Sequence, residues 1–261
     1  MSPTPLTSAQ AQYIRQLKSK KRRFQENAFV VEGKKSVFDL LASDYTTQMV
    51  VVTPQFLASE KAFFEKKAIP LLTTTSEQLT KISSLQHNEH TLAVATMKPN
   101  QPLTLSPNER ALVLDRIKDP GNLGTIMRIA NWYGIGKIFC SPTTVDCYNS
   151  KVIQSSMGSF THVESYYTPL APFLEQTNLP VVGAVLESTN YLHTSSLPYA
   201  GLLLLGNESH GISRELYPFF TQKVTIQPHG KARSLNVAIA TAVICEKWVT
   251  SSSNNDHGRQ E

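Results

Sequence analysis

The sequence predicts an α/β protein of two domains, a small N-terminal one and a larger one with a mostly parallel sheet. Short β-branched or leucine-rich runs alternate with amphipathic helical segments along nearly the whole chain, the pattern of strands covered by helices. A segment with three prolines, KPNQPLTLSPNER at 98–110, separates two such series and is typical of a linker. The predicted domains are therefore 1–97 and 111–250, followed by a flexible tail at 251–261.

The first half of the chain is expected to form a small three-layer α/β domain. Its strand-like runs are rich in β-branched residues, and its helical segments carry apolar residues at spacings of three and four. Ser76 has the side chain of an N-cap for the last of these helices. The expected strands are 29–31, 48–54, 69–75 and 91–97, and the expected helices are 34–43, 59–68 and 76–85.

The second half alternates in the same way, but its strands are more continuously apolar. Runs such as LPVVGAVLE and GLLLLGNE are typical of parallel strands that are covered on both faces. In the last helix, at 234–249, an alanine-rich face (Ala238, Ala240, Ala242) favours close packing, including packing against a second subunit. The other expected strands begin at 111, 137, 163 and 223, and the other expected helices at 123, 152, 169 and 213.

The composition excludes several classes of protein. Hydrophobic residues make up 41% of the 261, which is enough for packed cores and excludes global disorder. No apolar run reaches the roughly 18–20 residues that span a bilayer, and the N-terminus lacks the apolar stretch of a secretory signal. Cys140, Cys147 and Cys245 have neither zinc-site nor disulfide spacing, so we expect a reduced, cytoplasmic protein that binds no metal.

Positive charge is concentrated near the N-terminus. The net charge is only +5, but the segment RQLKSKKRRF contains no acidic residue. Such a cluster attracts polyphosphate chains, and RNA binding through it would weaken with salt. It can equally be an ordinary solvated helix face. The candidate RNA-binding residues are Arg15, Lys18, Lys20, Lys21, Arg22 and Arg23.

Three strand-to-helix turns of the second half have unusual residues, and ligands of parallel sheets bind at such turns. In DPGNLGTIMRIA, Asn122 stands where a helix N-cap is expected, and Arg128 lies off the apolar stripe of that helix. The spacing of this turn fits neither G-x-G-x-x-G nor the P-loop, which argues against a dinucleotide-binding oxidoreductase. Taken alone, Arg128 can be a plain solvent-exposed residue.

The other two turns place polar groups between a buried strand and a helix. In LLLLGNESHGIS, Gly206 and Gly211 flank Glu208, which allows the backbone to approach a ligand closely. An ordinary turn with a surface glutamate is the alternative. In IQPHGKARSLNVAIATAV, Ser234 and Asn236 lie at the start of a helix, and capping explains Ser234 better than Asn236.

Together, and in this order, DPGNLGTIMRIA, GNESHGIS and SLNVAIATA resemble the three motifs of the SpoU branch of the SPOUT RNA methyltransferases, which includes the TrmH-type ribose 2′-O-methyltransferases. The stretch KVIQSSMGSF looks like a further family motif, with Lys151, Ser156, Gly158 and Phe160 at its positions. FVVEGKKSVFDLL is similar to the family's substrate-binding domain, which is L30e-like. The resemblance covers roughly residues 12–250.

The resemblance implies a fold, a cofactor and a site. In the family the C-terminal sheet closes into a deep trefoil knot, S-adenosylmethionine binds within it, and two protomers form a homodimer with the active site at their interface. The substrate implied is RNA, with 23S rRNA favoured over tRNA because an L30e-like domain suits structured RNA. The implied catalytic residues are Asn122, Arg128, Glu208, Ser234 and Asn236. The implied cofactor-binding residues are Leu186, Glu187, Leu205, Gly206, Asn207, Gly211, Ile226, Ser234 and Leu235.

The sequence also departs from the family pattern and leaves two functions open. Gln227 and Pro228 replace the usual start of the third motif, Arg233 stands where a glutamate is common, and the Gln-Gly expected near residue 90 is absent. The first two departures can change how the RNA or the cofactor is placed, whereas the third concerns the RNA target and not the reaction. The alternatives are a tRNA ribose 2′-O-methyltransferase and an RNA-binding relative without catalysis; the five intact motif residues argue against the second.

Overall fold

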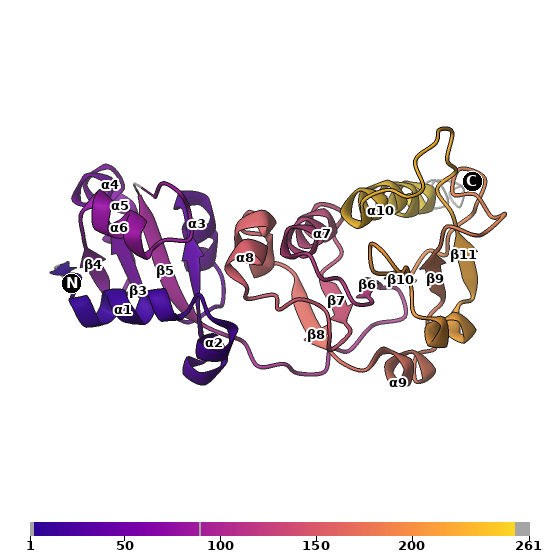
Figure 1. Ribbon diagram of the computed structural model, residues 1–261, viewed down its shortest axis with the longest axis horizontal. Coiled ribbons are helices and arrows are strands. Elements are labelled where there is room, and N and C mark those ends of the chain that lie inside the picture. The colour runs from indigo at the N-terminus through magenta and orange to yellow at the C-terminus, as the bar shows by residue number, and fades with distance from the viewer. Residues whose placement is uncertain (1–2, 89, 254–261) are drawn as a thin grey trace, which may run out of the picture. The chain divides into compact units, whose positions relative to one another are not determined.

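The computed structural model describes residues 3–88 and 90–253, and the chain divides into two compact units (Figure 1). Unit 1 combines the chain up to Pro99 with Asp146–Thr161, and unit 2 combines Asn100–Val145 with the chain from His162 onward. The segment Asp146–Thr161, which carries the KVIQSSMGSF motif, lies within the range that the sequence predicts for the methyltransferase domain. Its contacts are nevertheless with unit 1, because a buried ion pair and an aromatic cluster hold it there.

Unit 1 contains a mixed five-stranded sheet, in the order β1 (Thr4–Pro5), β4 (Leu71–Thr73), β3 (Thr47–Val52), β5 (Thr91–Thr96) and β2 (Ala28–Glu32). β5 is antiparallel to both of its neighbours, whereas β4 is parallel to β3 and β1. The four strands predicted from the sequence are confirmed, and β1 is an addition at the edge of the sheet.

Helices cover the sheet of unit 1. One core layer joins Ile14 of α1 and Leu79 of α6 to Val51 and Val94 of the central strands. The predicted helix at 59–68 is wrong in its bounds, because Pro54 starts a helix earlier and the chain breaks at Glu60. The helices are α1 (Ser8–Gln16), α2 (Lys20–Glu26), α3 (Lys34–Ala42), α4 (Pro54–Ser59), α5 (Lys61–Phe64), α6 (Ser76–Ile82), α8 (Ser150–Ser156) and the 3-10 turn η1 (Ser159–Thr161).

The predicted N-cap of α6 is also wrong by one residue. Thr75 is the cap, and its side-chain oxygen accepts a hydrogen bond from the backbone N–H of Gln78. Threonine satisfies a first-turn donor as serine would, so α6 begins at Ser76 itself.

Unit 2 contains a six-stranded sheet in which every neighbouring pair is parallel, as the sequence predicts. Figure 1 shows α7 (Pro120–Trp132) and α10 (Val237–Ser253) on one side of it and α9 (Leu170–Glu175) on the other. A 3-10 turn, η2 (Arg214–Phe219), packs with α9. The order of the strands is β11 (Gln222–Val224), β9 (Val181–Ala184), β10 (Gly201–Leu205), β6 (Arg110–Leu114), β7 (Lys137–Cys140) and β8 (Glu164–Tyr167).

This strand order creates a switch point between β6 and β10. The chain runs outward from β6 through β7 to β8, returns to the other side of β6, and places β10 directly beside it, with Leu114 opposite Leu205. Open parallel sheets bind ligands outside the carboxyl ends of the strands at such a reversal. The turns after β6 and β10 are those that carry Asn122 and Glu208.

The last helix differs from its expected bounds. It starts at Val237 and not at Ser234, and it continues to Ser253, past the start of the tail expected at 251–261. The rest of that predicted tail, 254–261, lies outside the described residues.

Candidate active site

Asn122 lies within the first turn of α7 and does not cap it. The N-cap is Asp119, whose carboxylate accepts a hydrogen bond of 2.8 Å from the backbone N–H of Asn122. Pro120 at the first helical position needs no such partner, because it has no N–H. The prediction that Asn122 caps this helix is therefore wrong, and its side chain is available for contacts with other segments.

Asn122 connects two other predicted catalytic residues. Its Nδ2 donates a hydrogen bond of 2.7 Å to Oε1 of Glu208, and its Oδ1 accepts one of 2.8 Å from Nδ2 of Asn236. A carboxylate only accepts hydrogen bonds, so it fixes the amide group of Asn122 with the nitrogen toward Glu208. The oxygen is then left for Asn236. One residue from each of the three motifs thus enters a single chain of hydrogen bonds, which we call the Asn–Glu chain (Asn236, Asn122 and Glu208).

Asn236 also begins α10. Its Oδ1 accepts hydrogen bonds from the backbone N–H groups of Ala238, at 2.9 Å, and Ile239, at 3.3 Å. The expectation that capping explains this asparagine poorly is wrong: the oxygen caps the helix while the nitrogen reaches Asn122. Ser234 is exposed in the loop before α10, and its catalytic role stays a prediction.

The loop after β10 folds back tightly on itself. The backbones of Asn207 and Gly211 exchange two hydrogen bonds, and Gly211 has a φ of +65°. A Cβ atom at Gly206 would lie 2.3 Å from the carbonyl carbon of Gly211, so only glycine fits there. The lack of a side chain at Gly206 therefore serves the close approach of the loop's own backbone.

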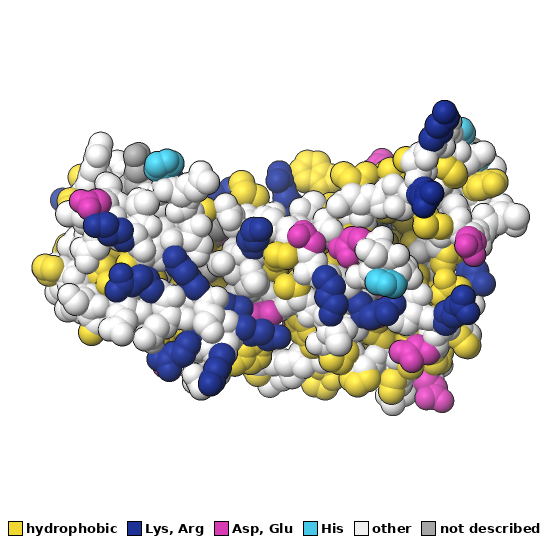
Figure 2. Space-filling model, viewed as in Figure 1, with side chains coloured by type: hydrophobic (Ala, Val, Ile, Leu, Met, Phe, Trp, Pro, Cys, Tyr) yellow, Lys and Arg dark blue, Asp and Glu magenta, His cyan; other side chains and the backbone are white. Residues whose placement is uncertain are grey.

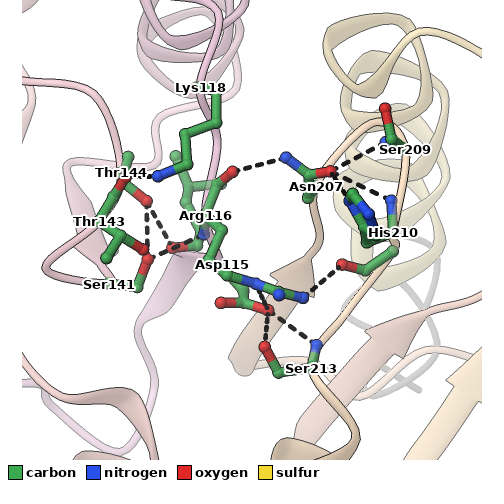
Figure 3. Close-up of polar contacts among 12 residues, drawn as sticks. Asp115, Arg116, Lys118, Ser141, Thr143, Thr144, Asn207, Ser209, His210 and Ser213 are labelled. Carbon is green, nitrogen blue, oxygen red and sulfur yellow. Dashed lines mark hydrogen bonds and ion pairs between the residues drawn. The ribbon is translucent and has the colours of Figure 1, made fainter.

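Hydrogen bonds and an ion pair join the base of this loop to the turn after β6, through residues that were not predicted to be functional (Figure 3). Asp115 is buried, and its Oδ2 accepts hydrogen bonds from the backbone and hydroxyl of Ser213, at 2.8 and 2.7 Å. The Nε of Arg116 lies 3.2 Å from the same oxygen. The sequence does contain a signal for this site, because Asp115 comes directly after four apolar strand residues. A charge at the end of a buried strand needs polar partners.

Arg116 also adopts an uncommon backbone conformation. Its φ is +56°, in the left-handed region, and its carbonyl accepts a hydrogen bond of 2.9 Å from Nδ2 of Asn207. The same nitrogen lies 3.3 Å from Oε2 of Glu208, so Asn207 links the turn after β6 to the Asn–Glu chain. A non-glycine residue in this region is strained by about 1–2 kcal/mol. Such strain is typical of functional sites.

Arg128 lies apart from the Asn–Glu chain. It follows Asn122 by six positions on α7, a rotation of about 240° around the helix axis, so the two side chains leave the helix on different sides. The Arg128 side chain is exposed, and it has no hydrogen bond or ion pair with the residues that the structure describes. Unit 2 therefore brings together three of the five predicted catalytic residues and leaves Arg128 and Ser234 outside the chain.

The predicted cofactor residues lie at the carboxyl ends of three adjacent strands. Leu186 and Glu187 follow β9, Asn207 follows β10, and Ile226 follows β11. Leu186 is 67% exposed, and Leu235 before α10 is 48% exposed. The remaining predicted positions in this region are Leu205, Gly206 and Gly211.

The predicted RNA-binding cluster is divided by the structure. Arg23 is 2% exposed: its Nη2 pairs with Asp146 at 2.7 Å, and its Nη1 donates to the carbonyls of Leu17 and Lys18. The prediction that Arg23 contacts RNA is wrong, because all of these contacts are internal to unit 1. Arg15, Lys20 and Lys21 are exposed, Lys18 donates to the carbonyl of Ser83, and Arg22 pairs with Glu26. Lys and Arg side chains gather over α1 and α2 in Figure 2.

Two further observations concern metals and membranes. Across residues 3–88 and 90–253, no group of three or more His, Cys, Asp and Glu side chains has an arrangement that could hold a metal ion. None of the helices in this part of the chain has the length and apolar character required to cross a bilayer.

The fold and the site define an α/β protein in which residues from three separate turns form an amide–carboxylate chain at the switch point of a parallel sheet. Two family models match this chain: SpoU rRNA Methylase family at residues 109–246, and MRM3-like substrate binding domain at residues 9–93. The first covers more than half of the sequence, and the chain belongs to the SpoU rRNA methylase family. The prediction of an RNA methyltransferase of the SpoU type is confirmed.

Relatives resemble the chain over nearly its full length. A 23S rRNA (guanosine-2′-O)-methyltransferase of Bacillus subtilis is 24% identical over 88% of this chain and 92% of its own length. A putative TrmH-family RNA methyltransferase of Porphyromonas gingivalis has a structure with a TM-score of 0.81 and 32% identity, covering 94% of this chain and 98% of that one. An AdoMet-bound rRNA methyltransferase of Sinorhizobium meliloti has a TM-score of 0.82 and 27% identity, covering 94% and 95%.

Proposed function

We propose that the protein transfers the methyl group of S-adenosylmethionine to a ribose 2′-hydroxyl of ribosomal RNA. The observation that carries this proposal is the Asn–Glu chain, because it joins one residue from each of the three motifs at the switch point. Two relatives named for rRNA, from Bacillus subtilis and Sinorhizobium meliloti, favour rRNA over tRNA as the substrate. The large-subunit rRNA is favoured by the first of these.

The residues at the carboxyl ends of β9, β10 and β11 fit S-adenosylmethionine. The exposed side chains of Leu186 and Leu235 offer apolar surface for an adenine ring, which a bound ligand would cover. Glu187, which follows Leu186 in sequence, is an exposed carboxylate that can accept hydrogen bonds from ribose hydroxyls. Asn207, Ile226 and the two loop glycines complete this set, with Ser234 beside Leu235. The cofactor supplies an electrophilic methyl group on a sulfonium.

The protein's part in the reaction is to orient the ribose and to manage one proton. A C–O bond forms as the S–C bond breaks, and the 2′-hydroxyl proton passes to a phosphate oxygen or to water. Positioning supplies much of the acceleration in such an in-line displacement. A guanidinium carries five N–H donors and no acceptor, so Arg128 acts by stabilising the developing alkoxide and not as a general base. The Asn–Glu chain holds the first turn of α7. Because Arg128 lies on the same helix, the chain helps to position it.

We also infer a homodimer in which a second copy covers α7 and α10. Trp132, one helical turn after Arg128, is 83% exposed, and Ile239 and Val243 of α10 are 53% and 40% exposed. These two helices pack on each other, so their exposed apolar side chains share one region of unit 2. A partner there would enclose Arg128. Replacing Trp132 with Glu should give monomers in sedimentation, and a wild-type protein that sediments as a monomer would contradict this part of the proposal.

Three finer expectations belong to the same proposal and rest on family membership. They are a deep trefoil knot in unit 2, an L30e-like fold of the N-terminal unit, and a cytoplasmic location. The spacing of Cys140, Cys147 and Cys245 supports the last, because it is typical of neither a disulfide framework nor a zinc site and suits a reducing compartment.

The proposed reaction is tested by incubating the purified protein with methyl-labelled S-adenosylmethionine and unmodified rRNA or tRNA, in the presence of a chelator. We expect label in rRNA, and nuclease digestion followed by mass spectrometry should place it on a ribose 2′-oxygen. Label on a base, or in tRNA alone, would overturn the proposed product or substrate. The absence of label from every RNA, with the RNA bound, would favour the RNA-binding relative without catalysis.

A further inference from the structure

One aromatic side chain of unit 1 is exposed among cations. Phe24 of α2 is 56% exposed, and the Nζ of Lys20 lies 5.6 Å from the centroid of its ring. Lys20 and Lys21 precede Phe24 by four and three positions, so both lie one helical turn from it. The ring contributes little to the core, although burying a phenylalanine side chain stabilises a protein more than burying most other side chains.

Another side of α2 is fixed by contacts within unit 1. Arg23 points inward and holds the carbonyls of Leu17 and Lys18 and the carboxylate of Asp146. The helix ends at Asn27, in a left-handed conformation, with its N–H bonded to the Arg23 carbonyl. Because these contacts hold the helix, the backbone at Phe24 and at the two lysines needs no further ordering when a ligand binds.

The surroundings of the ring suit an anionic partner. The one acidic residue of α2, Glu26, is paired with Arg22 at 3.0 Å, whereas Lys20 and Lys21 are exposed. An aromatic ring flanked by exposed cations is the usual arrangement for a single-stranded nucleic acid, in which bases stack and phosphates pair with lysines. A protein partner would need a larger apolar surface than one ring offers.

We propose that Phe24 stacks on an unpaired base of the RNA substrate while Lys20 and Lys21 contact the adjoining phosphates. The inference rests on the proposed function, which supplies RNA as the ligand. It assigns to α2 the recognition of an unpaired nucleotide in a loop or bulge. Every base has a π face, so the contact selects for an unpaired base and not for a sequence.

The test compares two RNA probes with the full-length protein: a stem-loop with an unpaired purine loop, and the same stem as a continuous duplex. Phe24→Ala should weaken binding to the stem-loop by about 5-fold to 100-fold and leave duplex binding unchanged. Phe24→Tyr and Phe24→Trp should bind the stem-loop like the wild type. Phe24→Leu, which keeps apolar area but has no ring face, should behave like the alanine variant.

A matched charge variant separates stacking from phosphate contact. Lys20→Gln should weaken binding to both probes and reduce the salt dependence, the slope of log K on log salt, by about one, whereas Phe24→Ala should leave that slope unchanged. Equal losses on both probes for Phe24→Ala, or full binding by Phe24→Leu, would overturn the stacking role. The second result would show that apolar area at this position, and not the face of a ring, is what RNA binding requires.

Failure of the proposed function would be visible separately. If the wild type binds the stem-loop but transfers no methyl group, the reaction is refuted while the Phe24 comparison still stands. If Phe24→Ala keeps wild-type binding while the wild type methylates RNA, only the stacking role is refuted.

Discussion

Arg23 on α2 and Arg128 on α7 both lie in segments whose sequence suggests contact with RNA, yet their surroundings are opposite. Arg23 is buried and its guanidinium is held by one carboxylate and two carbonyls. Arg128 is exposed and has no polar partner among the residues described. Buried charges persist only when they are paired, so the first is part of the architecture of unit 1. The second is free to meet a ligand or a second subunit.

The largest expected effect is on the architectural arginine. Arg23→Ala leaves Asp146 buried without its partner, which should lower the free energy of unfolding by about 3–5 kcal/mol. Urea denaturation followed by circular dichroism measures this loss. The control is Arg23→Met combined with Asp146→Leu, which should be more stable than the single variant because no charge is left unpaired. A loss below about 1 kcal/mol in the single variant would contradict the structural role.

Arg128→Ala should lower activity and leave stability unchanged, the reverse of Arg23→Ala. We expect methyl transfer to fall by about a hundredfold to a thousandfold, the effect of removing one group that stabilises a developing oxyanion. The urea midpoint and the affinity for S-adenosylmethionine should stay unchanged, since Arg128 has no contact inside the protomer to lose. Arg128→Lys keeps the charge but loses the planar guanidinium, so its rate of methyl transfer should lie between those of the wild type and Arg128→Ala. Wild-type turnover by the alanine variant would remove Arg128 from the site.

The sequence could predict the positions of Asn122 and Glu208 because each belongs to a connection that follows a recognisable strand. Parallel strands bring their carboxyl ends to one edge, so two local patterns were sufficient to place both residues near a common site. Asn236 was placed correctly near the same edge, but its dual role as helix cap and partner of Asn122 depends on the start of α10, which lies three residues later than expected.

The burial of Arg23 could not be predicted in the same way. Its partner, Asp146, is 123 positions away in sequence, in a segment that contacts unit 1 although it is flanked by unit 2. Within its own segment Arg23 looks like the five cations around it. The left-handed conformation of Arg116 was also hidden, since arginine carries no preference for it.

Asn122→Ala tests whether the Asn–Glu chain supports the free arginine. The variant removes one donor to a carboxylate, worth about 1.5–3 kcal/mol, so transfer should fall by roughly tenfold to a hundredfold. Its loss should be smaller than that of Arg128→Ala. In the double variant the two losses should be less than additive, because both act on the same oriented group. Fully additive losses would show that Asn122 does not act through Arg128.

Arg116 is intermediate between buried Arg23 and exposed Arg128. Its side chain is partly exposed and is paired with Asp115. The variants Arg116→Ala and Arg116→Gly both remove the side chain, but only glycine adopts a φ of +56° without strain. Arg116→Gly should therefore be more stable than Arg116→Ala by about 1 kcal/mol in urea denaturation. Equal stabilities would mean that the left-handed turn is not maintained in solution.

The transfer of a methyl group to rRNA is tested most directly by mass spectrometry of nucleosides from the rRNA and tRNA of cells that lack this protein. We expect the loss of one 2′-O-methylated nucleotide from rRNA, restored by the wild-type chain and not by Arg128→Ala. An unchanged set of 2′-O-methyl marks in rRNA, or restoration by the Arg128→Ala chain, would contradict the proposed reaction and the role of its arginine.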